Sequence, residues 1–267
     1  MFLRDGRVCE DCLGRLPWRA VTRKCYRGSS LQSAVLATSI GVHWRIGTFR
    51  EKVTRYIALN TFCRDKFISG GLPAERMRIK PNFIESAAAP DWNERNGGLF
   101  VGRLSREKGI DVLAKAISNT AIGALRVIGG GEMEKLAHQS FSENYLGFRK
   151  LDEILALMRK SSYLVVPSIC FENFPRTIVE AFSSGLPVIA SRIGALEEIV
   201  KEGVTGILFE PGNAQDLAAK LAWAESNPQE MLRMGRTARE EYEARYAPNK
   251  NYDMLIAIYD DAIAAIR

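Results

Sequence analysis

Apolar runs and amphipathic stretches alternate regularly along the chain from residue 99 onward. Short apolar runs, often rich in Val and Ile, predict buried strands at 99–101, 125–128, 145–148, 163–166, 187–190 and 206–209. Stretches of helical periodicity between and after them predict helices at 109–118, from 132, at 151–159, 176–184 and 214–226. Strands alternating with helices of this length indicate a parallel sheet covered on both faces, so the fold class is α/β with a Rossmann-like domain.

The part before residue 86 follows a shorter pattern. Residues 29–44 are helix-like, and R-Y-I-A-L at 55–59 and M-R-I-K at 77–80 predict strands. Asn60 or Thr61 caps a helix between these strands, which ends at Gly70-Gly71. This β-α-β fragment predicts the tail of a second sheet domain. Residues 1–28 look irregular because glycine and proline interrupt them.

Four segments follow from these patterns. Residues 1–85 are the partial N-terminal domain, 86–98 a linker by composition, and 99–246 the Rossmann-like domain. Helices at 229–246 and 251–266 are separated by a bend at Ala247-Pro248. We expect residues 247–267 to pack back toward the N-terminal part.

Composition restricts the class of protein. At 267 residues and 46% hydrophobic composition, the chain can bury a substantial core. No run approaches the roughly 20 apolar residues of a membrane-spanning helix, and the N-terminus does not resemble a signal peptide. An odd number of cysteines, five, argues against a disulfide framework. We therefore expect a cytoplasmic protein, with peripheral attachment to the inner face of the membrane as an alternative.

Charge is unevenly distributed along the chain. Residues 1–80 hold 16 Lys or Arg and 6 Asp or Glu, whereas the remainder is slightly acidic. This basic part is suited to anionic lipid headgroups or an acidic acceptor, and the alternative is a solvated basic surface without a partner. Nucleic acid is not expected as a partner because no recognised binding motif accompanies the charge.

Cysteines near the N-terminus raise the question of a metal site. Cys9 and Cys12 form a C-x-x-C pair, and Cys25 follows. A zinc site needs four ligands, and Cys63 or His43 would have to supply the fourth. The alternative is free thiols, which we favour, with no metal predicted.

The most informative stretch is F-E-N-F-P-R-T-I-V-E-A-F-S-S-G-L-P-V-I-A-S at 171–191. Pro175 is predicted at the first helical turn, and Gly185 caps the helix C-terminus. The free N–H groups at the helix start are suited to a phosphate. Glu172 precedes this helix and Glu180 lies within it. Carboxylates beside an anion site are suited to a group other than the phosphate, so we expect them to bind sugar or ribose hydroxyls.

Two further loops follow predicted strands. V-G-R-L-S-R-E-K-G-I places Arg103 and Lys108 where they could clamp a diphosphate and stabilise it as a leaving group. Gly129-Gly130-Gly131 permits close approach of the backbone to a ligand, although a glycine triplet is often only a turn. The basic loop, the glycine loop and the paired glutamates follow successive strands in this order, and this combination indicates a ligand site more strongly than any one of the three.

Together these segments resemble the retaining glycosyltransferases of family 4, which have the two-domain GT-B architecture. The matching segments are G-R-L-S-R-E-K-G at 102–109, V-I-G-G-G-E at 127–132, V-P-S-I-C-F-E-N-F-P-R-T-I-V-E-A at 166–181, G-L-P-V-I-A-S at 185–191 and G-I-L-F-E-P-G-N at 206–213. The resemblance covers residues 93–226 closely. It implies the C-terminal half of a GT-B fold joined to part of the N-terminal acceptor domain, whose glycine-rich loop and active-site His would precede residue 1.

The resemblance also implies roles for individual residues. Arg103 and Lys108 would hold the donor diphosphate, Glu180 the ribose hydroxyls and Glu172 the transferred sugar, so Glu172, Arg103 and Lys108 are the catalytic candidates. The remaining donor-binding candidates are Asn173, Phe174, Pro175, Thr177, Gly102, Gly130 and Phe148. Many relatives carry Gly at position 173, so Asn173 would affect which sugar fits. Phe148 would flank the base.

The predicted function is transfer of a sugar, with retention, from a nucleotide-diphospho-sugar to a sugar or lipid-linked acceptor in cell-surface polysaccharide or glycolipid synthesis. Two cations and a helix N-terminus can neutralise the leaving group, so no metal or cofactor is expected. The first alternative is a shortened, catalytically inactive nucleotide-sugar-binding module. The second is another GT-B enzyme, such as an epimerase or a phosphorylase.

Overall fold

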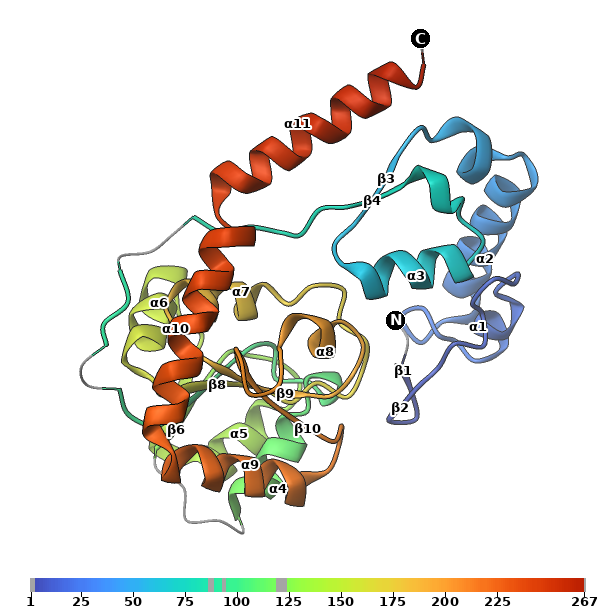
Figure 1. Cartoon of the computed structure of the whole chain (residues 1–267). Helices are drawn as coiled ribbons and strands as arrows, with labels where there is room; N and C mark the ends of the chain where they lie inside the picture. The colour runs from blue at the N-terminus through green and yellow to red at the C-terminus, as the bar shows by residue number, and fades with distance from the viewer. Residues whose placement is uncertain (1–2, 86–88, 93–94, 119–123, 267) are drawn as a thin grey trace. The chain divides into compact units, whose positions relative to one another are not determined.

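The structure, a computed structural model, describes residues 3–85, 89–92, 95–118 and 124–266 (Figure 1). The chain divides into two compact units. Unit 1 comprises Leu3–Val8 and Pro81–Asn251, and unit 2 comprises Cys9–Lys80 and Tyr252–Arg267.

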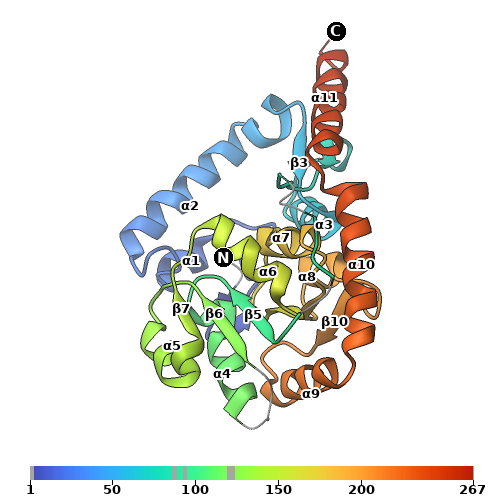
Figure 2. The ribbon, with the colours of Figure 1, turned by 90° about the vertical axis from the view of Figure 1, so that its left-hand side faces the viewer.

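Unit 1 contains a six-stranded parallel sheet in the order β10-β9-β8-β5-β6-β7. Its strands are β5 (Gly98–Val101), β6 (Leu125–Ile128), β7 (Tyr145–Gly147), β8 (Tyr163–Val166), β9 (Val188–Ser191) and β10 (Gly206–Phe209). β5, the first strand of this sheet along the chain, lies in its middle, and Figure 2 shows β5, β6 and β7 side by side. The chain continues outward to β7 and then returns to the other side of β5 at β8. The predicted Rossmann-like α/β domain is confirmed.

Helices connect and follow these strands. They are α4 (Ile110–Ser118), α5 (Glu134–Phe141), α6 (Leu151–Lys160), α7 (Arg176–Ser183), α8 (Ala195–Ile199), α9 (Ala214–Ser226) and α10 (Pro228–Arg245), with short 3-10 turns at Arg106–Lys108 and Ser142–Asn144. β8 and β9 are buried along their whole length because helices cover both faces of the sheet. The core includes Leu113 of α4 and Leu217 of α9, both fully buried.

Several predicted boundaries are wrong by one or two residues. The helix expected from Glu132 begins at Glu134, and Gly98, assigned to the linker, is already part of β5. Pro175 is the N-cap of α7 rather than its first helical residue. The sequence prediction also missed α8, a five-residue helix that begins directly after Gly194. One helical turn is too short for its periodicity to be recognised.

Residues 3–8 are not irregular, as the sequence suggested, but form a small hairpin. β1 (Leu3–Arg4) pairs antiparallel with β2 (Arg7–Val8). Asp5 and Gly6 connect them with positive φ angles of 51° and 74°. An Asp-Gly pair favours this turn, because both central residues must adopt the left-handed conformation.

The predicted linker is described in part, since residues 86–88 and 93–94 lie outside the described residues. Its described residues contact the rest of unit 1. Arg95 donates hydrogen bonds of 2.8 Å to the carbonyl oxygens of Ser184 and Gly185 at the end of α7. Trp92 lies so close to Gly185 that a Cβ there would meet its ring at 2.5 Å. This segment therefore caps the C-terminal end of α7.

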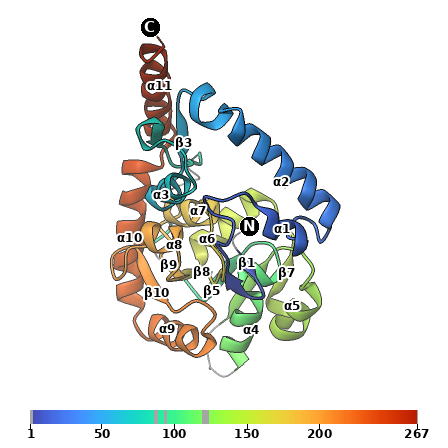
Figure 3. The ribbon, with the colours of Figure 1, turned by 90° about the vertical axis from the view of Figure 1, so that its right-hand side faces the viewer.

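Unit 2 is built mainly from helices around a small parallel sheet. Its elements are α1 (Trp18–Thr22), α2 (Ser30–Arg45), a π-helical turn (Thr48–Lys52), β3 (Tyr56–Ala58), α3 (Thr61–Ser69), a 3-10 turn (Ala74–Arg76), β4 (Met77–Ile79) and most of α11 (Pro248–Ala264). β3 pairs in parallel with β4. The predicted cap of α3 is confirmed, because Asn60 Oδ1 accepts a hydrogen bond of 2.7 Å from the N–H of Cys63. α1, which the sequence prediction missed, packs against α2 (Figure 3).

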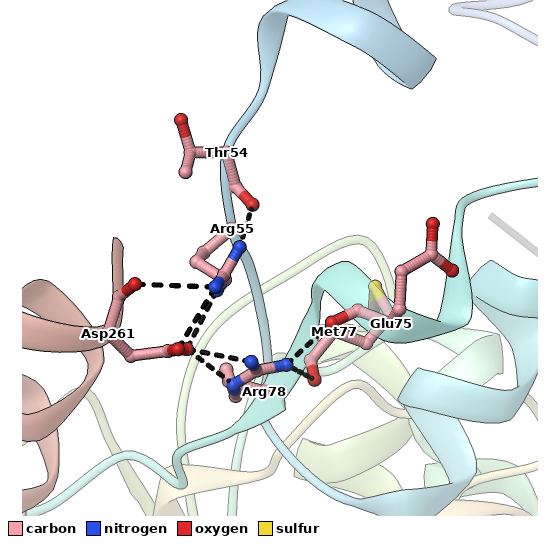
Figure 4. A network of polar contacts seen from close by, with 6 residues as sticks. All are labelled: Thr54, Arg55, Glu75, Met77, Arg78 and Asp261. Carbon is pink, nitrogen blue, oxygen red and sulfur yellow. Dashed lines mark hydrogen bonds and ion pairs between the residues drawn. The ribbon is translucent and has the colours of Figure 1, made fainter. Parts of the chain in front are cut away.

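A charged network joins α11 to both strands of this small sheet (Figure 4). Asp261 accepts hydrogen bonds from Arg55 Nε at 2.7 Å and from Arg78 Nε at 2.8 Å. The two guanidinium groups, with the hydrogen bond from Arg55 first, lower the pKa of Asp261 to about 2. One carboxylate thus holds arginines from β3 and β4 against the same helix.

Candidate functional site

The loops after β5 and β8 lie at the point where the order of strands in the sheet reverses. Ligands of parallel α/β sheets bind at the carboxyl ends of the strands, at such a switch point. The two loops touch: the N–H of Ile169 donates to the carbonyl oxygen of Glu107 at 3.0 Å. Gly109 has φ +71°, and a Cβ there would lie 1.8 Å from the carbonyl oxygen of Pro167. Only glycine permits this approach, so the loops hold one fixed arrangement.

Lys108 and Glu172, which lie 64 residues apart, meet across these loops. Lys108 Nζ lies 2.6 Å from Glu172 Oε1. The hydroxyl of Ser168 donates to the same oxygen at 2.7 Å. Oε1 therefore has two donors, both from residues at the carboxyl ends of β5 and β8. Ser168, which sequence reasoning missed, is only 1% exposed.

Arg103, the second predicted cation, lies on the same loop as Lys108. Its Nη2 forms an ion pair of 2.6 Å with Glu107 Oε1, and its side chain is largely exposed. Both predicted cations, Arg103 and Lys108, are thus paired with carboxylates of the protein. A diphosphate that bound here would replace these carboxylates as the partner of the two cations.

The glycine triplet lies against the basic loop, and its three residues differ. A Cβ on Gly129 would lie 1.8 Å from the carbonyl oxygen of Gly102, and one on Gly131 would lie 2.5 Å from that of Leu104. A Cβ on Gly130 would meet no other atom within 4 Å, so its α-carbon faces open space. The N–H of Leu104 also donates to the carbonyl oxygen of Gly130 at 2.9 Å. Gly129 and Gly131 are required for packing, whereas Gly130 is accessible.

The start of α7 carries most of the predicted donor-binding residues. Asn173 is exposed and Thr177 half-buried, while Pro175 is buried. Phe174 is buried, and its ring lies edge-on to Tyr246, with 5.9 Å between the ring centroids. The Phe174 side chain therefore supports the loop from within, and a donor contact by residues 173–177 stays a prediction.

Glu180 occupies the second turn of α7 and is only 7% exposed. Burial raises the pKa of its carboxyl above the ordinary value, and the nearby Arg176 partly opposes this rise. Among the described residues, no side-chain hydrogen bond to this carboxyl contributes to the shift of its pKa. A buried carboxylate favours ligands that carry hydroxyl groups.

Two aromatic residues lie at opposite ends of β7, Tyr145 at its start and Phe148 directly after it. Phe148 is 81% exposed, so its ring is free to stack on a planar group. Tyr145, which the sequence reasoning did not select, places its hydroxyl 2.9 Å from the carbonyl oxygen of Gly129 and 2.9 Å from Glu134 Oε1. Burial and the hydrogen bond to Glu134 raise its pKa to about 12, so it stays protonated and holds the glycine loop.

Metal coordination finds no support in the described part of the chain, which contains no group of three or more His, Cys, Asp or Glu side chains arranged to hold an ion. The zinc alternative for Cys9, Cys12 and Cys25 is therefore not supported. All five cysteines are free thiols. Cys170 is buried beside the site, and burial followed by the charge of Glu172 raises its pKa to about 11.

The fold and these loops define the class of the protein: a parallel α/β domain whose switch-point loops present cations, accessible glycine backbone and a helix N-terminus to one region, as nucleotide-binding domains do. Residues 85–241 match the family Glycosyl transferases group 1. The chain belongs to this family.

Relatives place the chain among glycosyltransferases. It is 36% identical over 187 residues to the uncharacterized glycosyltransferase MJ1178 of Methanocaldococcus jannaschii, covering 67% of this chain and 53% of the relative. It is 25% identical over 225 residues to the amylovoran biosynthesis glycosyltransferase AmsK of Erwinia amylovora, covering 76% of this chain and 55% of the relative. The chain thus spans about half the length of these relatives.

Solved structures support the GT-B-like fold. The complex of HepE from Anabaena with UDP-glucose superposes with a TM-score of 0.71 at 21% identity, covering 90% of this chain and 70% of that chain. The galactosyltransferase WaaB of the lipopolysaccharide outer core, in its apo form, gives a TM-score of 0.65 at 21% identity, covering 80% and 63%. At these identities the likeness concerns the fold alone.

Proposed function

We propose that this chain is a glycosyltransferase that moves a sugar from a nucleotide-diphospho-sugar to an acceptor hydroxyl. The observation that carries the proposal is the meeting of Lys108, Ser168 and Glu172 at the β5/β8 switch point. This arrangement places a cation and a carboxylate side by side, which suits the junction between a diphosphate and a sugar. UDP is the nucleotide we favour, because the HepE neighbour is described in complex with UDP and with UDP-glucose.

Each loop residue has a role in this proposal. Lys108 and Arg103 turn from their carboxylates to the diphosphate and stabilise the negative charge that grows as the sugar–oxygen bond breaks. The N-terminus of α7 adds its dipole to the same charge. Glu172 binds hydroxyls of the sugar and Glu180 those of the ribose, with Gly130 and the backbone of Asn173, Pro175 and Thr177 lining the donor.

The acceptor and the stereochemistry follow from the family resemblance. The bond from the anomeric carbon to the diphosphate breaks, its electron pair remains on the leaving oxygen, and the acceptor oxygen bonds to that carbon from the same face. The acceptor proton leaves with the diphosphate or the solvent, and the configuration is retained. We infer a sugar or lipid-linked acceptor of cell-surface polysaccharide or glycolipid synthesis, used in the cytoplasm or at the inner face of the membrane.

Calorimetry with UDP, UDP-glucose, UDP-galactose and UDP-N-acetylglucosamine tests the donor site. We expect binding that Arg103→Ala and Glu180→Ala each reduce at least tenfold. Arg159→Ala, in the last turn of α6, is the matched control and should bind as the unaltered chain does. Absence of binding by every nucleotide sugar, including donors built on other bases, would refute the proposal.

A nucleotide-sugar-binding module without transfer activity is the second candidate. This candidate needs only the donor-side loops described above, all of which belong to unit 1. Release of UDP from a bound donor distinguishes the two candidates. Turnover, as hydrolysis or as transfer to a glycolipid extract, supports the enzyme, whereas tight binding without turnover supports the module.

A further inference from the structure

The helical hairpin of unit 2, residues 12–50, combines three features that the donor site does not use. Between Asp11 and Glu51 the chain has seven Lys or Arg residues and no Asp or Glu. The same segment exposes eight large apolar or aromatic side chains: Leu16, Trp18, Tyr26, Leu31, Val35, Leu36, Val42 and Ile46. Helices α1 and α2 of this segment pack against each other (Figure 3).

The apolar side chains of α2 gather on one face. Leu31, Val35, Val42 and the adjoining Ile46 are spaced by four and seven residues, which places them within one narrow stripe of a helix with 3.6 residues per turn. Leu31 is 76% exposed and Val35 65% exposed. The opposite face packs inside unit 2: Ser33 and Ala37 are buried, and a Cβ on Gly41 would lie 3.0 Å from Leu16 Cδ2. The stripe is therefore the outer face of the hairpin.

Cations lie at both ends of this stripe. Lys24 and Arg27 precede α2, whereas Arg45 and Arg50 lie at or beyond its C-terminus. Among the described residues none of these four forms an ion pair within 4 Å, although Arg19 and Arg23 are both paired with Asp11. Arg27 lies over the ring of Tyr26, and Arg50 over that of Trp44. Uncompensated positive charge thus lies at both ends of an exposed apolar stripe.

We propose that this hairpin docks on an anionic lipid surface, with α2 lying in the plane of the headgroups. Apolar side chains of one helix face enter the acyl boundary, while Lys and Arg at the ends reach the phosphate groups and Trp and Tyr lie at headgroup depth. A second copy of this chain is a poorer occupant, since it would place like charges against each other. The described residues include no helix long and apolar enough to cross a bilayer.

This inference deepens the membrane location proposed above, and it can fail independently of donor binding. The test is flotation of the chain with vesicles of phosphatidylcholine alone and of phosphatidylcholine with one third phosphatidylglycerol. We expect binding to the anionic vesicles only, and weakening as salt is raised. K24E/R27E and L31Q/V35Q should each reduce binding about tenfold or more, while UDP binding by the same variants is unchanged.

Two control variants distinguish this surface from a general effect of lost charge or lost apolar side chains on vesicle binding. K135E/K160E removes the same charge from exposed helix positions of unit 1, and I263Q removes an exposed apolar side chain from α11; both should float as the unaltered chain does. Three results would overturn the inference: no binding to anionic vesicles at low salt, equal losses in K24E/R27E and K135E/K160E, or light scattering that shows a dimer dissociated by L31Q/V35Q. The last result would assign the stripe to a second copy.

Discussion

Replacement of Ser168 by alanine tests the geometry around Glu172. Lys108 and Ser168 both donate to Glu172 Oε1, at 2.6 and 2.7 Å. When Lys108 turns to a diphosphate, the hydroxyl of Ser168 becomes the donor that keeps the carboxylate in position. A hydrogen bond to a charged group contributes about 1.5–3 kcal/mol, and the burial of Ser168 hinders water from replacing the hydroxyl.

The expected effect of Ser168→Ala is therefore twofold. The free energy of unfolding falls by about 1.5–3 kcal/mol, which lowers the melting temperature by roughly 3–10 °C in a chain of this size. The affinity for UDP stays within about twofold, whereas the additional affinity for a UDP-sugar falls about tenfold. Ser168→Thr keeps the hydroxyl and should restore much of the additional affinity for the UDP-sugar.

Calorimetry with UDP and with the tightest UDP-sugar measures this difference directly. Ser161→Ala is the matched control, because Ser161 is fully buried and its hydroxyl donates only to a carbonyl oxygen, that of Leu157, at 2.8 Å. Equal losses for UDP and the UDP-sugar would mean that Ser168 only stabilises the fold. An unchanged preference for the sugar would refute the reasoning, because Glu172 would then not depend on Ser168.

Three further predictions concern the glycine loop and two carboxylates. Gly129→Ala should destabilise unit 1 by several kcal/mol in thermal unfolding, whereas Gly130→Ala should leave stability within about 1 kcal/mol and weaken donor binding. The pKa of Glu180 is raised by burial, so its contribution to stability is complete below the ordinary Glu range and is lost as pH rises through the raised pKa. Because hydroxyls bind the ionised carboxylate, affinity for UDP should rise over that same interval, and Glu180→Gln should remove this dependence in calorimetry. The pKa of Asp261 is lowered to about 2, so its stabilisation of α11 is present above the ordinary Asp range and is lost as pH falls toward 2. Hydrogen exchange of α11 should show this loss, and Asp261→Asn should show fast exchange already at neutral pH.

Local sequence signals were sufficient for the elements that carry strong periodicity or a clear cap. The strands of the six-stranded sheet and the Asn60 cap of α3 were predicted because each depends on neighbouring residues. The Asp5-Gly6 hairpin was missed although its turn residues are a known signal, since two-residue strands have no visible alternation. α8 was missed for a similar reason.

The site was predictable in its residue types but not in its pairings. Strand order cannot be read from local patterns, so the adjacency of β5 and β8 had no signal in the sequence. That adjacency is what brings Lys108 to Glu172 and adds Ser168 to the same oxygen. The unequal roles of Gly129 and Gly130 likewise depend on which carbonyl oxygen each one faces. Serine is so common that its residue type alone does not identify Ser168 as a site residue.

The internal ion pairs of Arg103 and Lys108 have a consequence for selectivity among anions. Arg103 and Lys108 each already pair with a carboxylate of the protein. An arriving anion must therefore compete with a carboxylate that is held in the chain and loses little entropy when it forms the ion pair. Orthophosphate is small and can replace only one of these partners at a time. In the proposed donor site, a ligand with two linked phosphoryl groups would replace both carboxylates together, which favours a nucleotide diphosphate over orthophosphate.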